Sequence, residues 1–171
     1  MNEHQRSARR DLEQERLLTD CTVSFTRRSG PGGQNRNKVE TAAILLHKPT
    51  GLRAEANERR SQLENREAAL FRLQLLLALS TRQIPPDTGP SPLWNARCGG
   101  GKIRVNPEHP DFPLLLAEAL DVLAANGADA RVAAESLGVS ATQLIRFLKD
   151  EPRALAWLNT ERSQRGLGPL R

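Results

Sequence analysis

The chain has 171 residues and a formal net charge of +5, from 25 Lys and Arg against 20 Asp and Glu. This length suits one domain or two small ones. The charge is uneven, because residues 1–106 hold 18 basic and 11 acidic side chains whereas residues 107–171 hold 7 and 9. We therefore expect the first part, and not the acidic tail, to bind nucleic acid.

Several classes of protein are disfavoured by composition. The longest apolar run, residues 75–79, is far too short to cross a bilayer, so no membrane association is predicted. The two cysteines, Cys21 and Cys98, are far apart, which predicts reduced thiols in a cytoplasmic protein and no metal site. The three histidines are isolated, and neither a nucleophilic triad nor paired carboxylates are visible. An unaided acid–base hydrolase is therefore not expected.

The first part of the chain predicts a small α+β domain. A charged helix is expected at residues 5–19. The helix that follows the strands begins at a capping box formed by Ser61 and Glu64 and runs to about residue 80. Pro49 and Gly51 predict a turn between the second and third strands. Alternating apolar residues predict strands over residues 22–27, 42–48 and 52–57.

Between the first two strands lies a glycine-rich loop. Gly32 and Gly33 allow backbone conformations and close approaches that other residues resist, and they present Gln34 at a tip without bulky neighbours. Positive charge beside such a backbone suits a phosphate-rich surface. The cations of the loop are Arg27, Arg28, Arg36 and Lys38.

Residues 81–110 are rich in proline and glycine and predict a linker. Residues 94–105 can form a hairpin around Gly99, Gly100 and Gly101. The Gly-Gly-Gly-Lys element is not a phosphate-binding loop, because the Ser or Thr and the following helix are missing.

The remaining residues, 111–171, predict a small all-α domain. Asp111 is expected to cap its first helix, and Ser140 with Gln143 forms another capping box. The spacing of Ala134, Gly138 and Phe147 is typical of a helix-turn-helix. The proposed recognition helix offers few cations, so three roles stay open: DNA reading, RNA or ribosome docking, and plain helical packing or protein contact.

Several separated segments, in order, resemble the catalytic domain of class-I peptide chain release factors and related ribosome-rescue hydrolases. The resemblance covers residues 21–79, roughly a third of the chain. Asn35 departs from it, since codon-reading members usually carry histidine there. The matching segments are residues 28–34 with the Gly-Gly-Gln triplet, 37–42 (Asn-Lys-Val-Glu-Thr-Ala), 47–52 (His-Lys-Pro-Thr-Gly-Leu), 60–62 (Arg-Ser-Gln), Asn65-Arg66 and Ala69-Leu70.

This resemblance implies ribosome-dependent hydrolysis of the peptidyl-tRNA ester in the peptidyl-transferase centre. Gly32, Gly33 and Gln34 would be catalytic, without metal or other cofactor. The four loop cations would bind large-subunit RNA. The implied partners are the ribosome, with its P-site peptidyl-tRNA, and a glutamine methyltransferase acting on Gln34. The protein is expected to be a monomer.

Codon-reading release factors carry a further large domain for the stop codon, for which this sequence has no room, so we expect a codon-independent hydrolase of the rescue type. The alternative is a non-enzymatic ribosome- or RNA-binding regulator that keeps the loop as a binding element. The expected domains are a catalytic domain at residues 1–80, a linker at 81–110 and a helix-turn-helix-like domain at 111–171.

Overall fold

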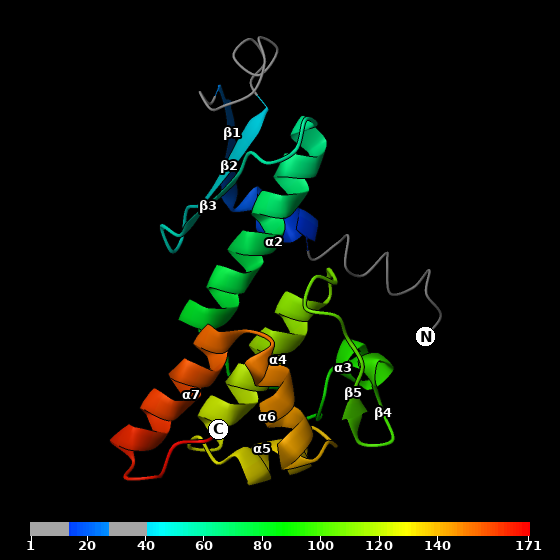
Figure 1. Cartoon of the computed structure of the whole chain (residues 1–171), viewed down its shortest axis with the longest axis vertical. Helices are drawn as coiled ribbons and strands as arrows, with labels where there is room; N and C mark the ends of the chain where they lie inside the picture. The colour runs from blue at the N-terminus through cyan, green and yellow to red at the C-terminus, as the bar shows by residue number, and fades with distance from the viewer. Residues whose placement is uncertain (1–13, 28–40) are drawn as a thin grey trace. The chain divides into compact units, whose positions relative to one another are not determined.

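The computed structural model describes residues 14–27 and 41–171. By its internal contacts the chain divides into two compact units, residues 2–77 and residues 78–171 (Figure 1). The described residues form a small antiparallel sheet and several helices, so the α+β class is confirmed. The domain limits at residues 80 and 110 stay predictions. No helix of the described residues is long and apolar enough to cross a membrane.

The first unit is built on a three-stranded antiparallel sheet in the order β1-β2-β3. The strands are β1 (Cys21–Thr26), β2 (Ala42–His47) and β3 (Arg53–Ala56), close to the predicted ranges. The predicted turn joins β2 to β3, with Gly51 at a φ of 70° and its amide donating to the His47 carbonyl at 2.8 Å. Glycine suits this turn because a side chain there would strain the backbone.

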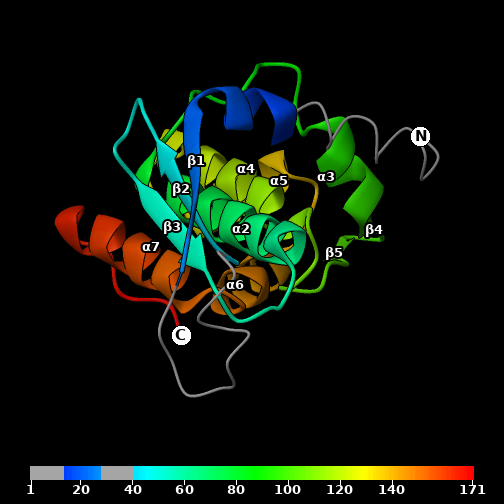
Figure 2. The same cartoon turned by 90° about the horizontal axis from the view of Figure 1, so that it is seen from above.

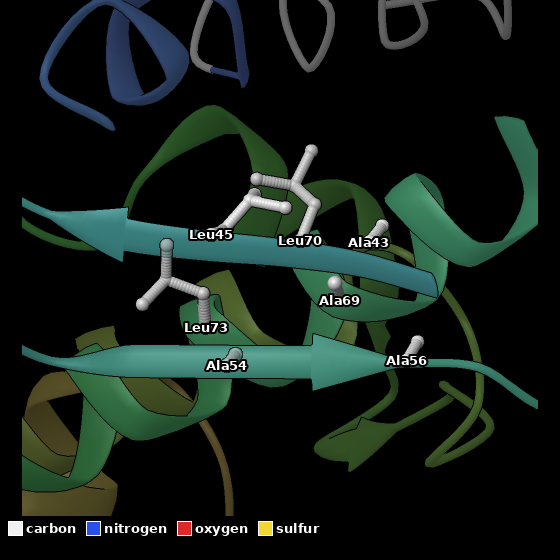
Figure 3. Packing of buried hydrophobic residues seen from close by; sticks show 7 residues of the cluster. All are labelled: Ala43, Leu45, Ala54, Ala56, Ala69, Leu70 and Leu73. Atoms are coloured by element: carbon white, nitrogen blue, oxygen red, sulfur yellow. The ribbon is translucent and has the colours of Figure 1, made fainter. Parts of the chain in front are cut away.

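Helix α2 (Gln62–Ser80) lies along one face of this sheet (Figure 2). It begins as predicted, since the Glu64 amide donates to Ser61 Oγ at 3.4 Å. Alanines at the sheet surface let the helix approach closely, and leucines fill the remaining space. The buried cluster consists of Ala43, Leu45, Ala54, Ala56, Ala69, Leu70 and Leu73 (Figure 3).

A further helical segment, residues 14–19, precedes β1. Leu17 and Leu18 pack against the same cluster. The beginning of the predicted helix, residues 5–13, lies outside the described residues. The described part therefore gives the sheet a second apolar support close to β1.

The second unit is mainly helical. A hairpin of β4 (Cys98–Gly99) and β5 (Lys102–Ile103) is present, but it is shorter than residues 94–105. Its predicted beginning is helical instead, since Ser91 caps α3 (Pro92–Arg97). The longer helices are α4 (Phe112–Ala125), α5 (Ala130–Ser136), α6 (Ala141–Lys149) and α7 (Pro152–Gln164).

Trp94 joins the predicted linker to these helices. Its side chain is fully buried, its Nε1 donates to the Leu137 carbonyl at 2.8 Å, and its ring meets Phe147 edge-on with centroids 6.1 Å apart. The ring of Phe147 also packs against that of Phe112, with the two centroids 5.2 Å apart. Such aromatic pairs contribute about 0.5–1.5 kcal/mol each beyond their burial. The proline- and glycine-rich segment is therefore anchored in the core of the second unit.

Helices α5 and α6 form the predicted helix-turn-helix. Gly138 in the turn has a φ of 67°, and Ser140 Oγ accepts from the Gln143 amide at 3.2 Å. The prediction that Asp111 caps α4 with its side chain is wrong. Its backbone is already helical, and its carboxylate accepts instead from Arg97 Nε at 2.8 Å and Nη2 at 2.6 Å.

We predict that Gly138→Ala destabilises the second unit by about 1–2 kcal/mol, the cost of holding a non-glycine residue in left-handed geometry. A Cβ at this position would meet nothing within 4 Å, so the loss would be purely conformational. Gly99→Ala is the matched control, because its site is equally open and its φ is not positive. Denaturant midpoints measure both variants, and equal losses would contradict the explanation.

Candidate active site

The pairing of β1 with β2 defines where the predicted catalytic segment leaves and re-enters the sheet. Thr26 pairs with Ala42, so the two ends of the intervening connection are adjacent. Long connections of this kind are commonly functional. Arg27 is described and exposed at the end of β1. The other predicted site residues lie outside the described part of the chain: Arg28, Gly32, Gly33, Gln34, Arg36 and Lys38.

The residue before β2 is held by a side chain of α2. Asn65 is fully buried, and its Nδ2 donates to the Thr41 carbonyl at 2.6 Å and to the Arg59 carbonyl at 3.0 Å. Its Oδ1 accepts from the Arg59 amide at 2.9 Å. One amide thus ties together the end of the loop, the segment after β3 and the first turn of the helix.

The hydrogen bonds of Asn65 form a first clasp, and the contacts of Arg72 form a second clasp that holds the segment after β3 against α2. Arg72 donates to the Glu55 carbonyl at 2.6 Å, and its Nη2 lies 2.6 Å from Glu58 Oε1. Burial alone would raise the pKa of Glu58, but hydrogen bonds from the amides of Asn57 and Glu58 and from Arg72 outweigh it and lower the pKa. Both charged side chains remain nearly half exposed, so their ion pair orders the segment more than it stabilises the fold.

These clasps place two exposed arginines, Arg59 and Arg60, next to the loop end. The sequence prediction did not assign them to the site. In the sequence the two arginines are visible only as a cationic pair directly before the capping Ser61. Their position near Thr41 depends on the hydrogen bonds of Asn65, which the sequence does not reveal. The described rim of the site therefore carries exposed cations on two segments, with Arg27 directly after β1 and the Arg59–Arg60 pair after β3.

The described residues offer little acid–base chemistry at this rim. His47 lies at the other end of β2, paired with Cys21, and its Nδ1 is 2.7 Å from Thr50 Oγ1. No group of three or more His, Cys, Asp or Glu that could hold a metal is found within residues 14–27 and 41–171. What the rim does provide is a rigid frame and positive charge.

Cys98 lies far along the chain, in a hollow lined also by Gly99–Gly101 and by residues 135–138. Burial, with a smaller contribution from Glu118, raises the pKa of its thiol to about 11. Burial followed by Asp20 also raises the pKa of Cys21. Neither thiol is therefore primed to act as a nucleophile at neutral pH.

Comparison with known proteins gives a match over residues 12–88 to the RF-1 domain. Peptide chain release factor PrfB1, chloroplastic, of Arabidopsis thaliana is 53% identical over 58 residues, covering 34% of this chain and 13% of that protein. Peptide chain release factor 1 of Leuconostoc citreum is 44% identical over 59 residues, covering 34% and 16%. That of Streptococcus thermophilus is 40% identical over 77 residues, covering 45% and 21%.

The chain thus spans about a fifth or less of the length of these relatives. The matched segment contains the sheet, α2 and the whole connection between β1 and β2. Residues 89–171 lie outside the match.

We expect Cys98 to resist alkylation at neutral pH. With a pKa of about 11 its reactive thiolate is scarce below that pH, so the rate should rise roughly tenfold per pH unit up to about pH 11. Mass-spectrometric timing of iodoacetamide labelling, with protein unfolded in urea as the control, measures this. A native Cys98 that reacts at pH 7.5 as fast as the unfolded one would contradict the burial argument.

Proposed function

Through residues 12–88 this chain belongs to the class-I release-factor-like family, and from that premise we propose that the protein hydrolyses the peptidyl-tRNA ester on the ribosome. The observation that carries the proposal is the closure of the Gly-Gly-Gln connection by the Thr26–Ala42 pair within the matched domain. This pairing supports a loop presented from a rigid base. The substrate ester would be positioned by ribosomal RNA in the peptidyl-transferase centre.

Gly32, Gly33 and Gln34 carry the chemistry in this proposal. The backbone N–H of Gln34 stabilises the oxyanion that develops on the ester carbonyl, and its side-chain amide lines the path of the attacking water. The two glycines let the tip adopt this position without a Cβ clash. A single oxyanion donor of this kind typically contributes about 3–4 kcal/mol to transition-state stabilisation.

The cations supply affinity. Arg27, Arg28, Arg36 and Lys38 contact phosphates of large-subunit RNA, and we add Arg59 and Arg60 from the segment after β3. Support comes from the exposure of the described members and from the two clasps that hold the segment after β3 in place. Phosphate contacts of this kind position a protein on RNA without reading its sequence.

We further propose that release is independent of the codon, as in ribosome rescue, and that the helical second unit contributes to the choice of ribosome. Helix α6 presents Arg146 and Lys149 as exposed cations, and Lys102 is exposed on the neighbouring hairpin. Peptide release on ribosomes with a stop codon, a sense codon or an empty decoding site tests this. Release only at stop codons would contradict codon independence.

Gln34→Ala and Gly33→Ala should abolish peptide release while leaving ribosome binding nearly intact, because the tip performs the chemistry and the cations provide the affinity. Single-turnover release of labelled peptide from purified ribosomal complexes, with pelleting to measure binding, checks both parts. Full release by either variant would remove the catalytic assignment. A parent that binds but releases nothing would favour the alternative, a non-enzymatic ribosome-binding regulator.

Ribosome affinity should fall steeply with salt, and each lost phosphate contact should flatten the slope of log Kd against log salt by about 0.7–1. We expect this for Arg28→Ala, Arg36→Ala, Arg59→Ala and Arg60→Ala. The control is Arg53→Ala, a cation on β3 at the other end of the sheet, paired with Glu55 at 2.9 Å. An unchanged slope in the arginine variants, or an equal change in the control, would show that the rim is not the anchor.

A further inference from the structure

We propose that Asn65 is a positioning residue for the Gly-Gly-Gln segment, an inference that rests on the proposed release activity. Its side chain fixes the carbonyl of Thr41, the residue from which the chain enters β2. The segment is thereby tied to helix α2 as well as to the sheet. Asn65 contacts neither substrate nor reacting atoms in this proposal, and it acts through the frame of the loop.

The contacts of Asn65 leave little freedom at the loop end. Both N–H bonds of its amide are used, one toward Thr41 and one toward Arg59, and its oxygen accepts from the Arg59 amide. The side chain is fully buried, so water cannot readily replace a lost partner. Two carbonyls and one amide from segments far apart in sequence therefore meet on a single side chain.

The chemistry of this site calls for asparagine. An ionised aspartate of the same shape could accept from the Arg59 amide but could donate to neither carbonyl. Leucine would fill a similar volume and bond to none of the three groups. Glutamine would add a methylene to a packed interior, where added volume is poorly tolerated.

The helix behind Asn65 is a stable support. Ala69, one turn further along α2, and Leu73, the next turn, are both fully buried against the sheet. The Thr41 carbonyl is thus fixed to a helix that is packed against the sheet. The Thr26–Ala42 pair constrains the same end through the strands, so loss of Asn65 would loosen the loop without dissolving the sheet.

Loosening should affect chemistry more than binding. Catalysis by positioning is sensitive to small displacements, and an error near 1 Å can cost on the order of a hundredfold in rate. Phosphate contacts act over longer distances and tolerate such shifts. We therefore expect Asn65→Ala and Asn65→Asp to lower the release rate at saturating protein by about tenfold to a hundredfold, with less than a threefold change in half-saturating concentration.

Leu73→Ala is the matched control. It opens a cavity beside the same helix and destabilises the domain, but its apolar side chain cannot hydrogen-bond to Thr41 or Arg59. Rates are compared at a temperature at which melting curves show every variant folded. If Leu73→Ala lowers the saturating rate as much as Asn65→Ala does, or if the Asn65 variants change only the half-saturating concentration, the proposal is wrong.

A second readout does not depend on release. Amide hydrogen exchange should accelerate in Asn65→Ala at residues 41–43 and 57–60 and remain slow at residues 45–47, whereas Leu73→Ala should not accelerate exchange selectively at the first two regions. An inactive parent would refute the proposed function, and the exchange pattern would still decide whether Asn65 holds the loop end. Asn65→Ser, which keeps a hydroxyl, provides a milder variant. Unchanged exchange, or unfolding of all three Asn65 variants, would overturn the positioning role.

Discussion

The antiparallel pairing of β1 with β2 is the constraint on which the first unit depends. Cys21 pairs with His47 at one end of the two strands, and Thr26 pairs with Ala42 at the other end. The connection from β1 to β2 therefore begins and ends at neighbouring positions. The same pairing aligns the apolar side chains of both strands on the face that α2 covers. The sheet therefore supports the core, and the connection that contains the Gly-Gly-Gln segment starts and finishes at the Thr26–Ala42 end of the strands.

The helix, the sheet and two side chains of α2 each contribute to the support of the loop. Small residues such as Ala43, Ala54 and Ala56 bring the helix close to the sheet, and that close packing gives the loop a stiff base. Asn65 joins the helix to the loop end at Thr41, and Arg72 joins it to Glu55 on β3. Within the proposed function the ribosome supplies the substrate's position, so the protein needs only a well-placed backbone amide, a side-chain amide and a cationic rim.

Features decided by neighbours in sequence could be predicted. The Ser61 and Ser140 caps each depend on a residue three positions away, and the Pro49–Gly51 turn depends on its own backbone geometry. The strands could be predicted from apolar patterning together with the position of this turn. The Gly-Gly-Gln triplet was recognisable by its resemblance to release factors, although its residues lie outside the described part of the chain.

Features decided by distant partners could not be predicted. Trp94 was assigned to a hairpin, but it donates to Leu137, which stands 43 positions away. Asp111 was expected to cap α4, and the guanidinium of Arg97 competes successfully for its carboxylate. From the sequence Asn65 is only part of a family motif, because its partner Thr41 is 24 positions away. In each case a charge or a buried hydrogen bond between remote segments decided the role.

The central claim is that the Gly-Gly-Gln tip acts directly at the peptidyl-tRNA ester. A cryo-electron-microscopy structure of the protein on a ribosome with a non-hydrolysable peptidyl-tRNA in the P site tests it most directly. The account predicts the backbone amide of Gln34 within hydrogen-bonding distance of the ester carbonyl, with the cationic rim on large-subunit RNA. A bound protein whose tip lies away from the peptidyl-transferase centre would contradict it.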